Sequence, residues 1–332
     1  MKIIHSLITI SLLGSVALAA PISTQSGFSG LVAGGITSLS YKNNMVAGTK
    51  FDDELSDKKI NNLSDSADKK SSIQPSFNFD IRYTFAQAQT EIFAKSILGD
   101  ILTFDSLAKI GARTHFDALG TIGLAALVST GPTQVWRDPY AVGVNRDTAD
   151  MSSMGIALKF ENIVDTGFSA EVKMRKFNID GDDESALGTG FNDVLNREGD
   201  LKEAIVSYQW DINAQHHLIT ALKYSDYDLD GKAMEHKETG LGINYMYFSQ
   251  KWNFFATAGI AKSDYDHTNP LFNKQADATV LSGSLTAMYN NPFEISEDLA
   301  LTATIATKES NSDINFYDSS IALMNIGLLY KF

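Results

Sequence analysis

The sequence of 332 residues lacks cysteine and also lacks a surplus of basic residues. Without cysteine the chain can form no disulfide framework, no thiolate metal site, no cysteine nucleophile and no lipid-modified cysteine at a lipoprotein N-terminus. Only 27 Lys and Arg residues stand against 40 Asp and Glu residues, which gives a net charge of −13. Because phosphate binding depends on a basic surplus, we expect no nucleic-acid partner.

Apolar runs long enough to form a membrane-spanning helix are lacking too. The N-terminal segment has an apolar stretch over residues 3–13 and an A-x-A site at 17–19. This pattern predicts a signal peptide over residues 1–19, since the stretch is shorter than the roughly 20 residues that a spanning helix needs. The best later run, at 118–128, has 11 residues with two glycines. We therefore expect an exported mature chain, residues 20–332, that is either soluble or inserted as strands.

Alternation of apolar and polar residues recurs from end to end, whereas helical periodicity is hard to find. In the clearest example, from Phe77 to Phe85, every second residue is apolar. Candidate strands lie near 26–41, 74–86, 88–97, 104–114, 117–129, 152–161, 167–179, 201–213, 216–228, 237–250, 252–264, 277–290, 297–308 and 319–332. Fourteen is an even number, as in bacterial single-chain barrels, and twelve strands is the alternative. The predicted fold is all-β, a transmembrane antiparallel up-and-down barrel.

Two features favour a membrane barrel over a soluble sandwich, which alternates in the same way. The strands run about 10 to 14 residues, which suits a tilted membrane crossing. Aromatic residues also lie near strand ends, where an interfacial girdle is expected; examples are Phe85, Trp210, Tyr247, Trp252 and Tyr289. Long connections alternate with short ones, as outer loops and periplasmic turns do in such barrels.

The excess of negative charge lies in the long connections. Seven generously bounded outer connections, the fifth of them at 226–238, hold 28 acidic and 13 basic residues. Subtracting these from the mature chain, which has lost Lys2, leaves 12 acidic and 13 basic residues. The barrel body is then nearly neutral, as a cylinder embedded in lipid should be. We place the protein in the outer membrane of a Gram-negative bacterium after Sec-type export, with lipid and lipopolysaccharide as partners.

The C-terminal residues carry the most specific pattern. Apolar residues occupy alternate positions up to a final phenylalanine, namely Met324, Ile326, Leu328, Tyr330 and Phe332. This stripe resembles the C-terminal strand by which bacterial outer-membrane proteins are recognised for assembly. The resemblance implies the barrel-assembly machinery as a partner, and physically the stripe is a lipid-facing row that ends in an aromatic belt.

Charged residues fall on the face opposite the apolar one, and nearly all belong to the second to eighth strands. The predicted lumen-lining residues are Asp80, Arg82, Glu91, Lys95, Asp105, Lys109, Arg113, Lys159, Glu171, Lys173, Arg175, Glu203, Asp211 and Lys223. The opposite wall carries uncharged polar residues, namely Asn244, Thr257, Thr302 and Thr304. One interpretation is an aqueous pore with a transverse field that favours anions or zwitterions. The other is a ladder of salt bridges that closes and stiffens the barrel.

Two loops contain candidate functional residues. Trp136, Arg137, Asp138 and Tyr140 surround a proline in the loop at 130–151, which is long enough to form a constriction or plug. Packing of this loop on its neighbours is the alternative.

A weak metal candidate is the D-x-D-x-D-G pattern of Asp226, Asp228 and Asp230. The pattern opens like a calcium loop, but its twelfth position is Lys237 rather than glutamate, so a hairpin turn is favoured. The acidic run that begins at Asp180 is most simply a solvated loop and is also a candidate for sharing divalent cations with lipopolysaccharide.

No catalytic arrangement is evident. His115, His216 and His217 fall at predicted periplasmic turns, and His236 and His267 fall in outer loops. The sequence holds no G-x-S-x-G or H-E-x-x-H pattern. We therefore expect no catalytic residues, no enzyme activity and no cofactor.

The segments VWRDPY at 135–140, NRDTAD at 145–150 and MGIALKFENIVDTGFSAEVKMRKFNID at 154–180 resemble an uncharacterised proteobacterial outer-membrane family, the domain of unknown function DUF2860. The resemblance implies location and fold and supplies no activity. We expect a passive, porin-like channel for small hydrophilic solutes. A non-conducting barrel that acts through its loops in adhesion or envelope structure is the first alternative. A lateral-diffusion transporter of hydrophobic compounds is the second. The oligomeric state stays open.

Overall fold

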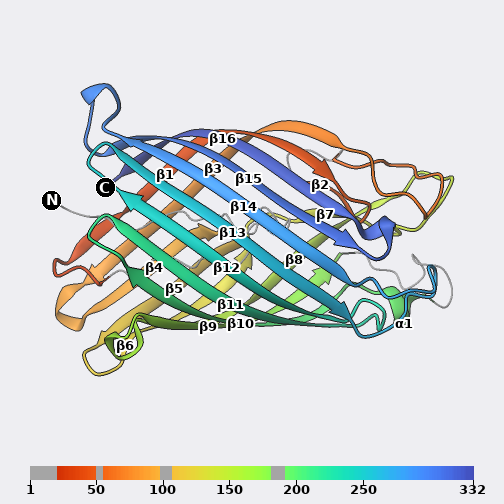
Figure 1. Cartoon of the computed structure of the whole chain (residues 1–332), viewed down its shortest axis with the longest axis horizontal. Coiled ribbons are helices and arrows are strands. Elements are labelled where there is room, and N and C mark those ends of the chain that lie inside the picture. Colours follow the sequence, from red (N-terminus) through yellow and green to blue (C-terminus); the bar gives the residue numbers. More distant parts are fainter. Residues whose placement is uncertain (1–20, 50–54, 98–106, 181–190) are drawn as a thin grey trace.

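The protein is an antiparallel β-barrel of fourteen long strands in up-and-down order (Figure 1). The computed structural model describes residues 21–49, 55–97, 107–180 and 191–332. The barrel strands are β1 (Gly27–Lys42), β3 (Lys70–Phe85), β4 (Thr90–Ile97), β5 (Leu107–Phe116), β6 (Gly120–Ser129), β8 (Thr148–Glu161), β9 (Phe168–Ile179), β10 (Gly199–Asp211), β11 (His216–Leu229), β12 (His236–Phe248), β13 (Trp252–Tyr265), β14 (Ala278–Asn290), β15 (Leu299–Ser312) and β16 (Ser319–Lys331). Each coincides with one predicted strand, which confirms fourteen strands rather than twelve. The predicted signal peptide lies outside the described residues.

Pairing of β1 with β16 closes the barrel. This seam runs from Lys42 opposite Ser320 to Leu31 opposite Lys331. Every other neighbouring pair in the ring is also antiparallel, because consecutive strands cross the barrel in opposite directions. None of the described helices is long and apolar enough to span a membrane.

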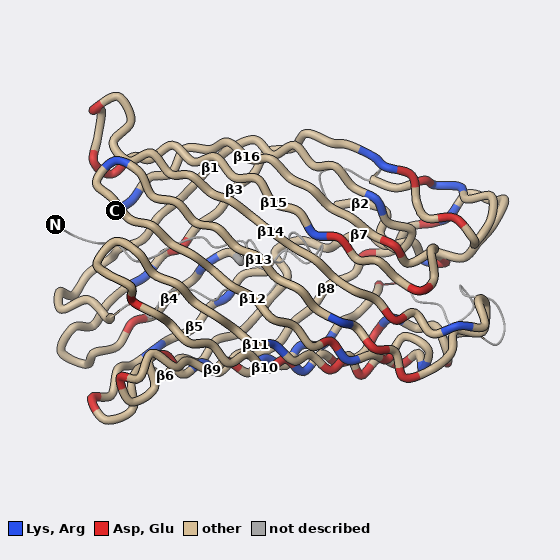
Figure 2. The backbone as a smooth tube through the Cα atoms, in the orientation of Figure 1, with Lys and Arg blue, Asp and Glu red and all other residues tan. Residues whose placement is uncertain are grey.

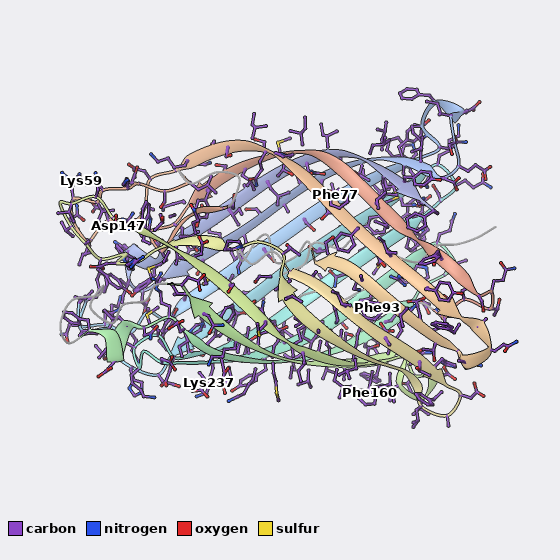
Figure 3. All side chains as sticks on the ribbon, turned by 180° about the vertical axis from the view of Figure 1, so that it is seen from behind. Lys59, Phe77, Phe93, Asp147, Phe160 and Lys237 are labelled. Atoms are coloured by element: carbon purple, nitrogen blue, oxygen red, sulfur yellow. The ribbon has the colours of Figure 1, made fainter. Side chains whose placement is uncertain are left out.

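The two ends of the barrel differ. Short turns and the C-terminus lie at one end, on the left in Figure 1, and the long connections lie at the other. Three-residue 3-10 turns shape the short-turn end, namely η1 (Ala86–Ala88), η3 (Ile163–Asp165) and η4 (Pro292–Glu294). The long-loop end carries the helix α1 (Asn192–Leu195) and the turn η5 (Asn315–Tyr317). In Figure 3 Lys59 and Asp147 lie at this long-loop end, and Phe160 lies at the other.

Two short strands were not predicted. β2 (Val46–Thr49) pairs with β7 (Thr133–Trp136), and β7 pairs with the first residues of β8. Together they extend one side of the wall beyond the long-loop end. Strands of four residues show too little alternation to stand out within connections that are otherwise rich in polar residues.

The outer wall of the barrel is apolar. Large side chains on alternate positions are well exposed, for example Ile73 at 77% and Phe77 at 68%. An aromatic girdle circles the short-turn end in four groups, Phe28–Tyr83–Phe85, Phe168–Tyr208–Trp210, Tyr247–Phe254–Trp252–Tyr289 and Tyr330–Phe332. Exposed apolar bands edged by aromatic rings are the surface that a lipid bilayer requires.

Candidate functional site: the barrel interior and its loop cap

Two chains of ion pairs lie on the inner wall between β3 and β12, and together we call them the charged ladder. Its members are Asp80, Arg82, Glu91, Arg113, Glu161, Lys159, Lys109, Glu171, Lys173, Glu203, Lys223 and Glu238. Their side chains are only 5–19% exposed, whereas the residues between them on each strand face outward. Three acids alternate with three bases within each chain, so the ladder itself carries no net charge.

The first part of the charged ladder centres on Arg113. Its guanidinium contacts Glu91 at 2.9 Å and Glu161 at 3.0 Å. Arg82 extends the chain from Glu91, at 3.4 Å, to Asp80, at 2.7 Å. Bidentate contacts of this kind match the planar fork of arginine to carboxylates.

The second part of the charged ladder alternates lysine with glutamate. Lys109 contacts Glu171, and Lys173 contacts Glu203 at 2.8 Å. Lys223 then lies 3.1 Å from both Glu203 and Glu238. Each lysine except Lys109 thus sits between two carboxylates, which compensates for the loss of water around it.

Small residues on β6 allow long side chains to meet across that strand. Gly123 lies between Arg113 and Lys159 in the register, and the Cβ of Arg113 would lie 3.3 Å from a Cβ at this position. A larger side chain at residue 123 would therefore separate Arg113 from Glu161.

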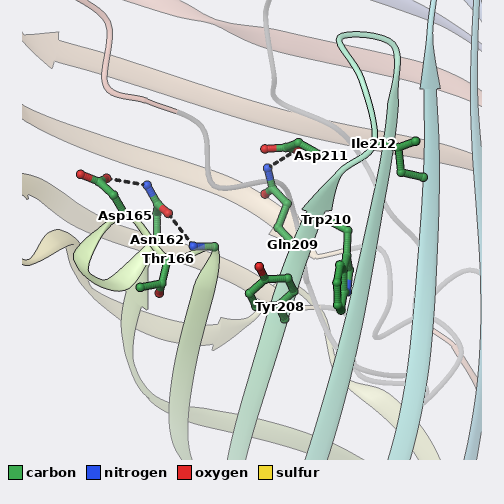
Figure 4. A pocket seen from close by; sticks show the side chains of 9 residues that line it. Asn162, Asp165, Thr166, Tyr208, Gln209, Trp210, Asp211 and Ile212 are labelled. Atoms are coloured by element: carbon green, nitrogen blue, oxygen red, sulfur yellow. Dashed lines mark hydrogen bonds between the residues drawn. The ribbon is translucent and has the colours of Figure 1, made fainter.

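Sequence reasoning missed two members of the charged ladder. Glu161 continues the alternation of Lys159 but was not assigned to the inner face, and Glu238 was counted with an outer loop. Glu238 lies on β12, which begins at His236. It is an even number of residues from Asn244, so the alternation of the strand places both side chains on the same, inward face. Of the other predicted lining residues, Asp105 lies outside the described residues, and Lys95 and Arg175 lie near Phe93 and Phe177. Asp211 lines a pocket at the short-turn rim (Figure 4) and lies beside His217, with its side chain 61% exposed, rather than within the charged ladder.

The opposite inner wall carries hydroxyl and amide groups. Thr257 and Ser284 hydroxyls are 2.8 Å apart, and those of Thr286 and Thr304 are 2.9 Å apart. The Asn325 amide on β16 donates to Thr37 on β1 at 2.8 Å, across the seam. Thr302, also predicted to line this wall, donates to the Gly327 carbonyl at 3.3 Å.

Asn244 is the exception among these polar groups. Both its side-chain oxygen and nitrogen are buried without a hydrogen-bond partner, and the residue is 1% exposed. An unsatisfied buried amide is costly, and bound water is the common remedy.

Six outer connections pack together into one apolar cluster, the loop cap. Its buried members are Tyr140, Leu195, Leu229, Ala233, Met234, Ala276, Ile314 and Phe316, and partly buried neighbours include Met45, Ile60 and Leu63. Acidic residues gather at the same end, on the right in Figure 2. The loops thus combine a charged surface with an apolar core.

The loop cap crosses the mouth of the barrel. β8 and β15 are seven places apart in the ring of fourteen, so they lie on opposite sides. Tyr140, from the loop before β8, and Tyr317, from the loop after β15, bring their hydroxyls within 2.6 Å. Asn269 donates to the Tyr317 hydroxyl at 2.7 Å. Burial raises the pKa of Tyr140 to about 12 and also raises that of Tyr317.

Arg146 anchors the loop between β7 and β8. It is 2% exposed and donates to the carbonyls of Asn44, at 2.9 Å, of Pro139, at 3.0 Å, and of Asp57. Its guanidinium stacks 4.4 Å from the ring centre of Trp136. Burial lowers the pKa of Arg146 to about 10.

The candidate constriction loop is therefore part of the loop cap. Trp136 is buried and donates to the Ser56 hydroxyl at 2.6 Å, and Asp138 accepts from the backbone of Tyr140. The Trp136 and Arg137 carbonyls accept hydrogen bonds from Arg197. The loop packs on its neighbours at the mouth of the barrel.

The calcium-like pattern is divided between a strand and a loop. Asp226 and Asp228 belong to β11, where Asp228 pairs with Lys202, and Asp230 begins a six-residue connection rather than a tight hairpin turn. Lys237 pairs with Asp266. Within the described ranges no group of three or more His, Asp or Glu residues is placed to hold a metal ion.

The histidines occupy separate places. His217 contacts Asp211 at 2.6 Å and His216 contacts the Tyr245 hydroxyl at 2.6 Å, both at the short-turn end. His236 stacks between two tyrosine rings at the long-loop end. The absence of enzyme activity stays a prediction.

The C-terminal stripe lies on the outer face of β16. Met324 and Ile326 are 63% and 69% exposed, and Leu328, Tyr330 and Phe332 are exposed as well. Their proposed part in assembly stays a prediction.

A closed strand ring, an apolar exterior, an aromatic girdle and an inner wall with charged and polar groups define a membrane β-barrel of the outer-membrane type. The chain belongs to the family described as "Protein of unknown function (DUF2860)", whose model matches residues 27–331. This confirms the family resemblance of the three segments quoted above.

Similar solved structures are outer-membrane proteins of low sequence identity. OmpT of Vibrio cholerae is 9% identical, with 92% of this chain and 97% of that chain covered and a TM-score of 0.43. A FadL homologue of Pseudomonas aeruginosa is 9% identical, with coverages of 91% and 90% and a TM-score of 0.45. The outer membrane channel DcaP of Acinetobacter baumannii is 10% identical, with coverages of 95% and 100% and a TM-score of 0.42. No curated protein matches the chain.

Proposed function

We propose that the protein is a passive outer-membrane channel for small hydrophilic solutes, closed at its outer mouth by the loop cap. One observation supports this most directly: every strand of the barrel turns a polar side chain inward. Representative residues in ring order are Thr37, Asp80, Glu91, Arg113, Thr121, Ser153, Glu171, Glu203, Lys223, Asn244, Thr257, Thr286, Thr304 and Asn325.

The energetics of buried charge support a role in transport rather than in stability alone. Replacing a buried ion pair by apolar side chains is often neutral or stabilising by about 1–4 kcal/mol. A barrel that needed only to be stable would therefore gain from an apolar interior. Polar groups on all sides instead suit a path for water and for solutes that form hydrogen bonds.

The charged side chains of the inner wall indicate which solutes would pass through the barrel. The charged ladder is neutral, and Lys95 and Arg175 add positive charge beside it. Ladder pairs on one wall and hydroxyl groups on the other create a transverse field. We propose that anions and zwitterions pass more readily than cations.

Planar-bilayer recording tests the proposal, and the lack of native cysteine makes the loop cap easy to lock. In the double variant Tyr140→Cys/Tyr317→Cys a short bismaleimide would join the two loops. We expect conductance steps from the untreated variant and their loss after cross-linking. Single-cysteine variants treated with the same reagent are the control.

The alternative outcomes are distinct. Steps that persist in the cross-linked protein would show that the loop cap does not govern passage. If neither the wild type nor the unlinked variant conducts, the channel proposal is wrong and the non-conducting barrel is favoured.

A further inference from the structure

The charged ladder is interrupted, and both of its chains end in a lysine at the same place. The first chain ends at Lys159, which pairs with Glu161 at 2.7 Å. The second chain begins at Lys109, which reaches across β6 and β8 to contact Glu171 on β9. Glu171 lies directly opposite Lys159 in the β8–β9 register, yet its carboxylate contacts Lys109 and Lys173. The two chain ends therefore lie close together, but no ion pair of the described residues joins them.

Lys95 is a third lysine at this interruption. It lies directly opposite Lys109 in the β4–β5 register, on the part of the wall that Phe93 marks in Figure 3. The positive charges of Lys109 and Lys159 both act on the Lys95 ammonium. We call the place where these three lysines meet the ladder gap.

The Lys95 ammonium has no compensating carboxylate. Its other neighbour in register is Asp80 on β3, but Arg82 holds both oxygens of Asp80 at 2.7 Å. Within the part of the chain that the structure describes, no acid lies within ion-pair distance of Lys95. The ammonium instead lies 5.8 Å from the centre of the Phe93 ring. A cation–π contact leaves its three N–H donors available for an anion.

The three positive charges at the ladder gap favour an anion that the wall itself does not supply. Like charges directly opposite each other destabilise a pair of strands, and Lys95 and Lys109 are such a pair. Lys95 is partly buried, and Lys109 shares its one carboxylate with Lys173. A compact anion with two negative charges would compensate for both ammonium groups. Phosphate has this charge and several strong acceptor oxygens.

We propose that the ladder gap binds the phosphate group of a solute inside the barrel. Lys95 would contribute its N–H donors, and Lys109 and Lys159 would contribute those that their carboxylates leave over. A bound phosphate would then link the two chains into one continuous ladder. The inference rests on the proposed function, because the solute reaches the ladder gap through the barrel. It narrows the anions of that proposal to phosphate and small phosphate esters.

Isothermal titration calorimetry of the purified, folded barrel tests the inference without any measurement of conductance. The probe is inorganic phosphate at about pH 8, where it is mainly a dianion, and nitrate at the same ionic strength is the comparison. We expect phosphate to bind about tenfold more tightly than nitrate, because the dianion compensates for two ammonium groups and nitrate for one.

Substitutions of Lys95 test the site without breaking an ion pair of the ladder. Lys95→Gln should fold, as seen by a heat-shift gel, and should bind phosphate about tenfold more weakly than the wild type. Lys95→Arg keeps the charge and the donors, so its affinity should stay within about threefold of the wild type. The matched control is Lys202→Gln, which removes the same charge from an exposed ion pair outside the barrel interior and should leave phosphate binding unchanged.

The outcomes separate this inference from the channel proposal. Equal binding of phosphate and nitrate, or equal phosphate affinities of Lys95→Gln and the wild type, would overturn the ladder gap as a phosphate site even if the barrel conducts. Phosphate binding that depends on Lys95 in a barrel without conductance would support the site and refute only the channel.

Discussion

The charged ladder makes a sharp prediction for Lys223→Met. Lys223 lies 3.1 Å from both Glu203 and Glu238, with its side chain 9% exposed. At an effective dielectric of about 20, each contact is worth about 5 kcal/mol of Coulomb energy. Part of this gain offsets the desolvation of the lysine, so measured losses on breaking a buried pair are about 3–5 kcal/mol. We expect the free energy of unfolding of Lys223→Met to fall by that amount.

Lys202→Met is the matched control. Lys202 pairs with Asp228 at the same distance of 3.1 Å, but both side chains are at least half exposed. Because water and salt screen such a pair, we expect no measurable loss. Urea unfolding in lipid vesicles, followed by tryptophan fluorescence, measures both variants.

A second variant distinguishes the effect of an uncompensated buried charge from that of a general packing defect. Lys223→Met/Glu238→Gln replaces the carboxylate that has lost its lysine with a neutral amide, while Ser263 can still donate to residue 238. We expect the double variant to regain about half of the lost stability, since it no longer buries an uncompensated charge. Equal losses in Lys223→Met and Lys202→Met, or no recovery in the double variant, would refute the argument.

Further predictions concern the loop cap and the seam. Because the pKa of Tyr140 rises from 10 to about 12 in the folded loop cap, its contribution is complete below pH 10 and is lost as the pH rises to 12. Protease cleavage of the outer loops should increase over that range in the wild type, and Tyr140→Phe should flatten this dependence. Arg146→Met leaves carbonyls of the loop cap without their donor and should expose the same loops to protease at pH 7, at a cost of about 3 kcal/mol. Gly35→Val should prevent closure, because a Cβ at residue 35 would lie 2.4 Å from the Ile326 carbonyl oxygen; a heat-shift gel that still shows a folded band would contradict this.

Period-two alternation sufficed to predict the fourteen strands, because the lipid and the interior impose opposite demands on neighbouring residues. The same alternation predicted that the charged residues lie on the inner wall. Glu238 was counted with the generously bounded connection at 226–238, although the predicted strand at 237–250 already contained it and β12 begins at His236. The alternation of apolar and polar residues along β12 was sufficient to place the Glu238 side chain on the inner face.

The loop cap could not be predicted from the sequence. The hydroxyl contact between Tyr140 and Tyr317 joins residues that are 177 positions apart, and its partners share no local pattern. The sequence left two interpretations open for the loop at 130–151, a constriction or packing on neighbouring loops. Only the order of the strands in the ring shows that this loop meets a loop from the opposite wall. Buried Arg146 was also missed, since a lone arginine in a polar loop usually lies in water.

The β1–β16 seam has a consequence for how the molecule forms and persists. It joins residues such as Leu31 and Lys331, which lie 300 positions apart along the chain. Closing a loop of that length costs about 5 kcal/mol of entropy before any hydrogen bond of the seam forms. Local hairpins can assemble quickly, but the ring is completed by one slow, non-local step. Once the ring is closed, each of its fourteen strands has a paired neighbour on both sides, so the lifetime of the barrel should be set by the rate at which the seam opens.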